Sequence, residues 1–165
     1  MDKLTVRIAD LSDMPQFMGV YESAREFMRR TGNPTQWGDS FPPAELLEEH
    51  IQAGHLYAVV NEEGIQGAFA FIMGEDANYS LIENGSWLSD EEYGTIHRVA
   101  SNGSVKGVFD VIMDFCEKQT NHLRIDTHEN NKVMRRLIEK HDFSMRGIIY
   151  AYDGSPRIAY EKLLS

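Results

Sequence analysis

The stretch 93–119 constrains the fold more than any other part of the sequence. It reads YGTIHRVA, SNGSVKG and VFDVIMDFCEKQ, which predicts a strand, a polar loop with two glycines and a helix. From Val105 onward apolar residues recur at helical spacing, and charged residues take the opposite side. A helix that follows a glycine loop presents unpaired backbone N–H groups and about half a positive charge. This combination indicates an anion site, most often one for phosphate.

The loop 101–107 is not one of the two best-known nucleotide-binding loops. It lacks the pattern G-x-x-x-x-G-K-[ST], and the spacing of Gly103 and Gly107 differs from that of G-x-G-x-x-G. Two glycines before a helix also occur in ordinary strand–helix connections. The loop by itself therefore leaves two interpretations open, an anion site and a plain connection.

Length and composition predict one domain over residues 1–165. A chain of 165 residues is long enough to bury about 70% of its unfolded surface. Its 42% hydrophobic and 25% charged residues are typical of globular proteins. The N-terminal residues lack the apolar core of a signal peptide, and no apolar run reaches membrane-spanning length. The single cysteine, Cys116, fits a reducing compartment, so we expect a cytoplasmic protein without membrane association.

The charge of the chain limits its partners. A net charge of −10 argues against nucleic acid, because no basic stripe is present to neutralise phosphates. The same charge permits a cationic small molecule or a basic peptide. The segment 74–92 carries six carboxylates and neither lysine nor arginine. A connection this long is commonly functional, although a solvated acidic loop explains the same composition.

The other segments alternate between strand and helix patterns. Strands are predicted over 4–8, 55–61, 65–73, 93–100, 122–127, 146–152 and 157–163. Helices are predicted after Ser12, from Pro42, from Val105 and from His128 or Glu129. The pair Asp153-Gly154 predicts a tight turn in the last hairpin. This order predicts a mixed sheet with helices packed against it.

Three segments, taken together with the element order, resemble the GNAT superfamily of N-acetyltransferases over nearly the whole chain. HRVASNGSVKGVFDVIMDFC is similar to the family's acetyl-CoA segment, and DTHENNKVMRRLIEKHDF is similar to the strand and helix that follow it. GIIYAYDGSPRIAYEKL is similar to the final hairpin. The resemblance implies an α/β (α+β) fold, with a mixed, mostly antiparallel sheet of about seven strands, four flanking helices and splayed fourth and fifth strands.

The resemblance also implies an acetyl-CoA site along the fourth strand and the helix after it. Val99 and Ala100 would bind pantetheine through their backbone, and the amides of Ser104 through Phe109 would hold the pyrophosphate. Lys106 would add a charge-assisted contact, and Asn131 would contact the pantetheine arm. The implied cofactor-binding residues are Val99, Ala100, Ser104, Val105, Lys106, Gly107, Val108, Phe109 and Asn131.

Direct acetyl transfer to an amine needs a base for the amine proton and an acid for the departing thiolate. His97 is the first candidate base, because histidine exchanges protons near neutral pH; a hydrogen-bonded core histidine is the alternative. Glu92 is the second candidate base, with a solvated loop end as its alternative. Ile138 stands where many family members have a tyrosine acid. Tyr150 or Tyr152 is therefore the candidate acid, unless these tyrosines simply pack.

The predicted acceptor is a primary amine of a small molecule or peptide, and the acidic segment favours a cationic one. The predicted acceptor-binding residues are Trp37, Tyr79, Trp87 and Tyr93. We predict no metal, since His128-Glu129 lacks the second histidine of H-E-x-x-H. A homodimer is compatible with the sequence.

One alternative function comes from a different class of protein. The same fold could serve as a catalytically silent acyl-CoA-binding or protein-interaction module. Two departures from the family pattern motivate this alternative: Ile138 replaces the tyrosine acid, and Phe109 replaces the second glycine or alanine of the cofactor loop.

Overall fold

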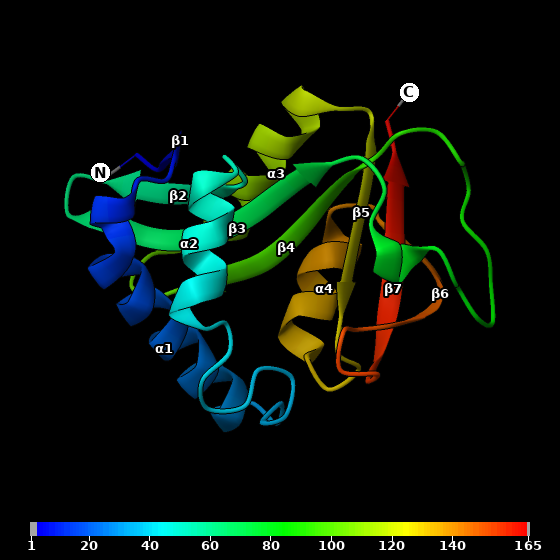
Figure 1. The fold of residues 1–165 in the computed structure, drawn as a ribbon, viewed down its shortest axis with the longest axis horizontal. Coiled ribbons are helices and arrows are strands. Elements are labelled where there is room, and N and C mark those ends of the chain that lie inside the picture. The colour runs from blue at the N-terminus through cyan, green and yellow to red at the C-terminus, as the bar shows by residue number, and fades with distance from the viewer. Residues whose placement is uncertain (1–2, 165) are drawn as a thin grey trace. The chain divides into compact units, whose positions relative to one another are not determined.

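The computed structural model describes residues 3–164, which form seven strands, four α-helices and two short 3-10 helices. The strands make one sheet in the order β1-β2-β3-β4-β5-β7-β6 (Figure 1). Strands β1 and β2, β2 and β3, β5 and β7, and β7 and β6 pair antiparallel, whereas β4 and β5 pair parallel. The predicted mixed, mostly antiparallel sheet with four helices is confirmed.

The element bounds follow the sequence prediction closely. The strands are β1 Thr5–Ile8, β2 Leu56–Asn61, β3 Gly64–Met73, β4 Gly94–Ser101, β5 His122–Thr127, β6 Ser144–Tyr150 and β7 Pro156–Leu163. The α-helices are α1 Met14–Arg30, α2 Ala44–Gln52, α3 Val108–Gln119 and α4 Lys132–Lys140. The 3-10 helices are η1 Leu11–Asp13 and η2 Ala77–Tyr79.

Three helices begin later than the sequence predicts. Helix α2 starts at Ala44 rather than Pro42, because Pro43 is extended with ψ of 157°. Helix α3 starts at Val108 rather than Val105, because Gly107 has φ of 85° and cannot continue a helix toward the N-terminus. Helix α4 starts at Lys132 rather than at 128 or 129, because Asn131 caps it. The Oδ1 atom of Asn131 accepts a hydrogen bond from the backbone N of Met134 at 3.1 Å.

The chain groups into two compact units. Unit 1 comprises Met1–Phe71 and His97–Phe115, and unit 2 comprises Ile72–Ile96 and Cys116–Ser165. The prediction that 1–165 acts as a single domain stays a prediction. No helix within residues 3–164 has both the length and the apolar character needed to cross a membrane.

In unit 1, helices cover both faces of strands β2 and β3. One core joins side chains from α1, α2, β2 and β3, among them Phe17, Tyr21, Leu47, Leu56, Ala58, Ala68 and Ala70. Tyr57 and Phe69 alternate with these strand residues and so face the other way, with their rings 5.3 Å apart. Phe115 of α3 lies 4.8 Å from the Tyr57 ring. Helix α3 therefore packs on the face opposite to α1 and α2.

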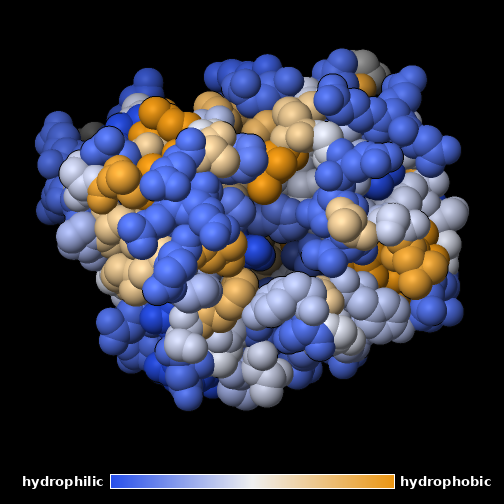
Figure 2. All heavy atoms as spheres, in the orientation of Figure 1, coloured by the Kyte–Doolittle hydropathy of each residue, from blue (hydrophilic) through white to orange (hydrophobic). Residues whose placement is uncertain are grey.

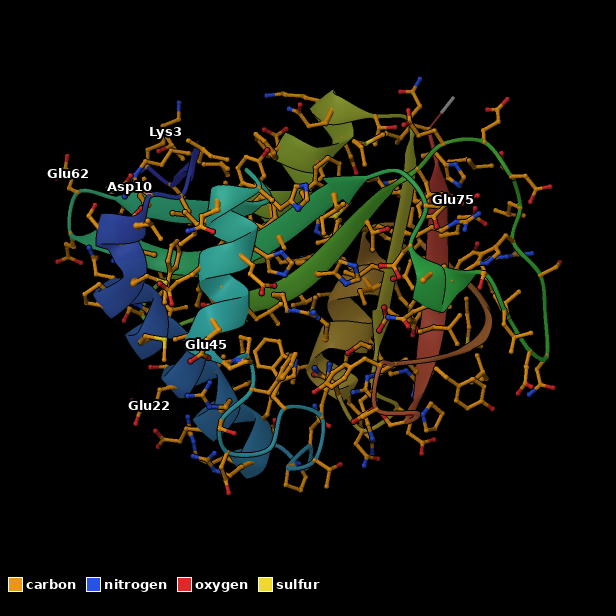
Figure 3. All side chains as sticks on the ribbon, viewed as in Figure 1. Lys3, Asp10, Glu22, Glu45, Glu62 and Glu75 are labelled. Carbon is orange, nitrogen blue, oxygen red and sulfur yellow. The ribbon has the colours of Figure 1, made fainter. Side chains whose placement is uncertain are left out.

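The outer face of unit 1 carries both polar and apolar side chains, among them the exposed Met18 and Phe27. Hydrophilic side chains predominate on the face shown in Figure 2, with apolar side chains interspersed. The labelled carboxylates Glu22, Glu45 and Glu62 lie on the outside of the ribbon in Figure 3 and are exposed. The apolar stripes of α1 and α2 thus face the sheet, as their spacing predicts.

In unit 2, the acidic segment 74–92 is ordered against the strands. Glu83 forms an isolated bridge with Ile148 of the edge strand β6, with N–O distances of 2.9 and 2.8 Å. The backbones approach so closely there that a Cβ on Gly85 would lie 1.7 Å from the carbonyl oxygen of Arg146. Covering the edge of β6 leaves fewer backbone groups of the sheet unpaired.

Candidate functional site

Strand β4 contains a left-handed residue in its middle. Arg98 has φ of 56°, a region that residues other than glycine adopt rarely. Its carbonyl oxygen accepts a hydrogen bond from the hydroxyl of Tyr21 at 2.7 Å, and its guanidinium lies 5.1 Å from the centre of the Phe41 ring. Such a conformation costs about 1–3 kcal/mol and occurs most often at functional sites. The sequence carries no signal for it, because arginine has no special preference for this region.

The pairing between β4 and β5 ends just before this residue. Its parallel register joins Gly94 to Leu123, Thr95 to Arg124 and Ile96 to Ile125. The rest of the strand, from His97 to Ser101, continues past this register. This short ladder agrees with the predicted divergence of the fourth and fifth strands.

The loop between β4 and α3 is held by its own polar side chains. Asn102 Oδ1 accepts a hydrogen bond from Ser104 N at 2.9 Å, and Ser101 Oγ accepts one from Gly103 N at 3.1 Å. Gly107 accepts the first helical hydrogen bond from Val111 N at 3.1 Å, so it caps the helix. The amides of the first turn of α3 then lack intrahelical acceptors. This is the local geometry that the glycine loop predicts for an anion site.

The first side chains of α3 turn inward. Val108 and Phe109 are each 5% exposed, whereas Ser104, Lys106 and Gly107 are exposed. Phe109 therefore packs in the core instead of lying on the exposed surface of the loop. A Cβ on Gly67 of β3 would lie 2.6 Å from Val108 Cγ1 and 2.9 Å from the carbonyl oxygen of Ala100. Glycine at position 67 thus lets the start of α3 approach β3 and β4 closely.

A partly buried histidine of α2 lies close to the middle of β4. Burial, together with Arg98, His97 and His55, lowers the pKa of His50 to about 4. The rings of His50 and His55 lie 6.3 Å apart. Within residues 3–164 the Nε2 atom of His50 is buried and has no hydrogen-bond partner. His50 is therefore neutral near pH 7, and it shares its surroundings with the candidate base His97.

Of the predicted acceptor-binding residues, Trp37 lies in unit 1. Its ring is 5.6 Å from that of Tyr21, which donates to the carbonyl of the left-handed residue Arg98. In this way the α1–α2 connection and the middle of β4 are joined through the buried Tyr21. Sequence analysis missed Tyr21, Arg98 and His50, because their importance comes from contacts between distant segments.

The other three predicted acceptor-binding residues lie in unit 2, where they pack with one another. The Tyr79 ring is 5.3 Å from that of Trp87 and 6.1 Å from that of Tyr93. Tyr79 donates a 2.6 Å hydrogen bond to Asp126 Oδ2, and burial and this carboxylate raise the pKa of Tyr79. Trp87 donates from Nε1 to the carbonyl oxygen of Tyr79 at 2.9 Å. Packing explains these contacts, and a role in acceptor binding stays a prediction.

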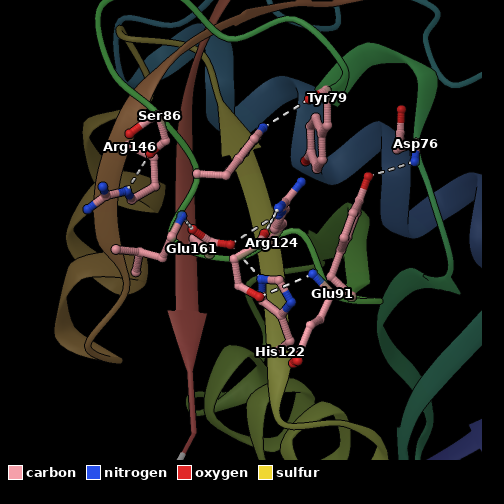
Figure 4. A network of polar contacts seen from close by, with 12 residues as sticks. Asp76, Tyr79, Ser86, Glu91, His122, Arg124, Arg146 and Glu161 are labelled. Atoms are coloured by element: carbon pink, nitrogen blue, oxygen red, sulfur yellow. Dashed lines mark hydrogen bonds and ion pairs between the residues drawn. The ribbon is translucent and has the colours of Figure 1, made fainter.

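Beside these rings, unit 2 buries a network of charged side chains (Figure 4). Glu161 is fully buried and accepts hydrogen bonds from His122 Nε2, Arg124 Nε and the backbone N of Leu88. Arg124 lies 3.9 Å from the centres of both the Trp87 and Tyr93 rings, and its Nη2 donates to Ser89 O at 2.7 Å. The network therefore ties the acidic segment to β5 and β7.

Three further predicted site residues also lie in unit 2. Glu92 is exposed at the end of the acidic segment, and Asn131 caps α4. Tyr150 is exposed and donates to Glu83 Oε1 at 2.6 Å, which raises the pKa of Tyr150. Their roles in catalysis and cofactor binding stay predictions. In the part of the chain that the structure describes, no group of three or more His, Cys, Asp or Glu residues is arranged to hold a metal ion.

The fold is similar to solved acetyltransferase structures along the whole chain. An acetyltransferase of the GNAT family from Streptococcus agalactiae gives a TM-score of 0.89 at 26% identity, covering 98% of this chain and 96% of that chain. A GNAT family acetyltransferase from Listeria monocytogenes gives 0.72 at 20% identity, covering 98% and 95%.

One of the less similar structures belongs to an enzyme with a stated acceptor. An acetyl transfer enzyme from Salmonella typhimurium, which modifies the N-terminal serine of the 50S ribosomal subunit protein L7/L12, gives a TM-score of 0.65 at 14% identity and covers 98% and 95%. No protein-family model and no curated protein matches the sequence. The similarity is thus one of fold, and it confirms the resemblance that three sequence segments indicated.

Proposed function

Because the chain has the fold of the GNAT superfamily of acetyltransferases along nearly its whole length, we propose that it transfers an acetyl group from acetyl-CoA to a primary amine. The observation that carries the proposal is the TM-score of 0.89 to a GNAT family acetyltransferase over 98% of the chain. The acceptor is a small molecule or the amino terminus of a peptide. The net charge of −10 supports attraction of its ammonium form.

The cofactor site that we propose in unit 1 follows β4 into α3. The backbone of Val99 and Ala100 continues past the β4–β5 register, which supports its use by the amides of the pantetheine chain. The amides from Ser104 through Phe109 are proposed to hold the pyrophosphate. Support comes from the exposed loop, from the positive end of the α3 dipole, and from the exposed side chain of Lys106.

The proposed reaction is a direct transfer. The amine nitrogen attacks the thioester carbonyl carbon, a C–N bond forms, and the C–S bond breaks. His97 takes the proton that the nitrogen loses, and the guanidinium of the adjacent Arg98 favours a neutral amine. The thiolate leaves with a proton from an acid. Glu92 stays the second candidate base and Tyr150 the candidate acid.

Binding of acetyl-CoA, measured by calorimetry, tests the cofactor site. The change Gly107→Glu places a carboxylate and a side chain at a position with φ of 85°, so we expect a loss of affinity of at least about a hundredfold. Gly154→Glu is the matched control, since Gly154 has φ of 80° in the turn after β6. Equal affinity in both variants, or no binding by the wild type, would overturn the proposal.

A turnover assay distinguishes the proposed acetyltransferase from a catalytically silent acyl-CoA-binding module. An amine panel is assayed with wild type and with His97→Ala, and we expect kcat to fall by about a hundredfold while the affinity for acetyl-CoA is kept. Salt of about 0.5 M is expected to raise the KM of a cationic acceptor, because screening weakens its attraction. Binding of acetyl-CoA without turnover on any amine would favour the silent acyl-CoA-binding module.

A further inference from the structure

Helix α1 buries an arginine that has no carboxylate partner. Arg25 is only 8% exposed. Within residues 3–164 its guanidinium makes one hydrogen bond, from Nη1 to the carbonyl oxygen of Phe41 at 3.1 Å. A guanidinium has five N–H donors. Burying such a group is costly unless an anion accompanies it.

The carboxylates closest to Arg25 in sequence do not offset its charge. Glu22 and Glu26 are exposed, and Glu22 points away from the sheet in Figure 3. The next carboxylate in the chain, Asp39, pairs with Arg29 at 3.4 Å on the exposed side of α1. Within residues 3–164 no carboxylate pairs with Arg25, so its remaining N–H groups are available to a ligand.

More positive charge gathers around the residue that Arg25 contacts. The Arg98 guanidinium lies 5.1 Å from the ring of Phe41, whose carbonyl accepts from Arg25. Burial is the largest cause of the lowered pKa of His50, and the charge of Arg98 is the next, so Arg98 also acts on this side chain of α2. Both guanidinium groups therefore contact the same residue of the α1–α2 connection, Phe41.

An aromatic side chain that is only partly buried, Trp37, lies near these two arginines through the buried Tyr21. Tyr21 donates to the carbonyl of Arg98 at 2.7 Å, and the Trp37 ring lies 5.6 Å from the ring of Tyr21. Aromatic side chains offer contact area, and a guanidinium fork matches two oxygens of a carboxylate or phosphate.

We propose that Arg25 and Arg98 bind an oxyanion on the acceptor, so that the acceptor is an amine that also carries a carboxylate or a phosphate ester. The identity of the acceptor rests on the proposed acetyl transfer, whereas the oxyanion site rests on unit 1 alone. His97 and Arg98 both act on His50, so the proposed base and this arginine lie near the same residue of α2. The global negative charge still attracts the ammonium end of such a zwitterion.

Two matched pairs of amines test the proposal. β-Alanine is compared with propylamine, and phosphoethanolamine with ethanolamine, by calorimetry on the protein alone and by acetylation kinetics. We expect at least one member that carries the oxyanion to bind about tenfold or more tightly than its partner, which has only the ammonium group. The pair with the larger ratio identifies the group as carboxylate or phosphate. Equal binding within both pairs, or binding of none of the four, would overturn the site.

Variants of Arg25 test whether this side chain causes the preference for amines that carry an oxyanion. Arg25→Gln is expected to remove the tenfold preference and to leave the affinity for acetyl-CoA unchanged. Arg29→Gln, on the exposed side of the same helix, is expected to keep both. If Arg25→Gln does not fold, Arg25→Lys keeps the charge but loses the fork, and we expect it to weaken the preference severalfold. A full preference in a folded Arg25 variant contradicts the proposal.

The readouts separate this proposal from the proposed function. Calorimetry of the four amines needs neither acetyl-CoA nor turnover, so it reports on the oxyanion site even if the chain transfers no acetyl group. Conversely, acetylation of amines with and without the oxyanion at equal KM would support the enzyme and refute the oxyanion site.

Discussion

Two buried arginines, one in each unit, have opposite surroundings. Arg124 in unit 2 is 4% exposed, lies between two aromatic rings and donates to Glu161 and to Ser89 O. Arg25 in unit 1 is 8% exposed and donates to one backbone carbonyl. Burial alone therefore does not distinguish them; the number and charge of their partners do.

The difference separates a structural charge from one that is available to a ligand. Arg124 belongs to a network in which the protein itself supplies the counter-charge, and the network holds the acidic segment in place. Such a network is costly to break, since removal of one member leaves the others buried and unpaired. Arg25 has no carboxylate partner, so its removal leaves no buried carboxylate unpaired, and an added anion would stabilise it.

The largest expected effect comes from replacing each arginine by methionine. Arg124→Met should lower the free energy of unfolding by about 3–5 kcal/mol, because Glu161 loses its buried cation. Arg25→Met should change it by no more than about 1 kcal/mol, since it replaces an unpaired charge by an apolar chain. Urea unfolding near neutral pH measures both. Similar losses in the two variants would remove the distinction between them.

A smaller effect tests whether the start of α3 packs tightly on β3 and β4 in unit 1. Gly67→Ala should destabilise by about 1–3 kcal/mol, because the new Cβ meets Val108 and the carbonyl oxygen of Ala100. The affinity for acetyl-CoA should also fall, since the start of α3 must shift. Gly19→Ala in α1 is the control: its Cβ meets no atom within 4 Å, and alanine should stabilise the helix slightly. The two substitutions having the same effect would contradict this packing.

The lowered pKa of His50 predicts a pH dependence of stability. Its folded pKa of about 4 is below the ordinary value of 6.5, so between these values the unfolded chain binds more protons. The free energy of unfolding should therefore fall as the pH falls through this window. Allowing for the partial exposure of the ring, we expect a loss of about 1–2 kcal/mol. Urea unfolding of wild type and His50→Gln at several pH values measures it, and parallel pH profiles would refute it.

The smallest effect concerns an exposed residue of unit 2. Tyr150→Phe removes the hydrogen bond to Glu83 on the surface, so stability should change by no more than about 0.5 kcal/mol. We expect kcat to fall by about tenfold if the thiolate takes its proton from this hydroxyl, with Tyr152→Phe as the control. An unchanged kcat would assign the proton to water. A large loss of stability would instead place Tyr150 in the structural network.

Local patterns predicted much of the fold and part of the candidate site. The strand, loop and helix over 93–119 were predicted with the correct order, because glycine at positive φ and helical spacing act over a few residues. The start of α3 was placed three positions early, since apolar Val105 fits the helical stripe although Gly107 interrupts it. Whether the acidic segment is ordered could not be predicted, because its bridge to Ile148 joins residues 65 positions apart.

By itself, the sequence determined the kinds of elements, their order along the chain and the glycine-bounded start of α3, since these depend on neighbouring residues. Only the tertiary structure decided which buried arginine has a carboxylate beside it. The residues that flank Arg25 and Arg124 in the sequence do not predict which of the two has a carboxylate partner. Their difference arises because Glu161 reaches Arg124 across paired strands, whereas the carboxylates of α1 point to solvent.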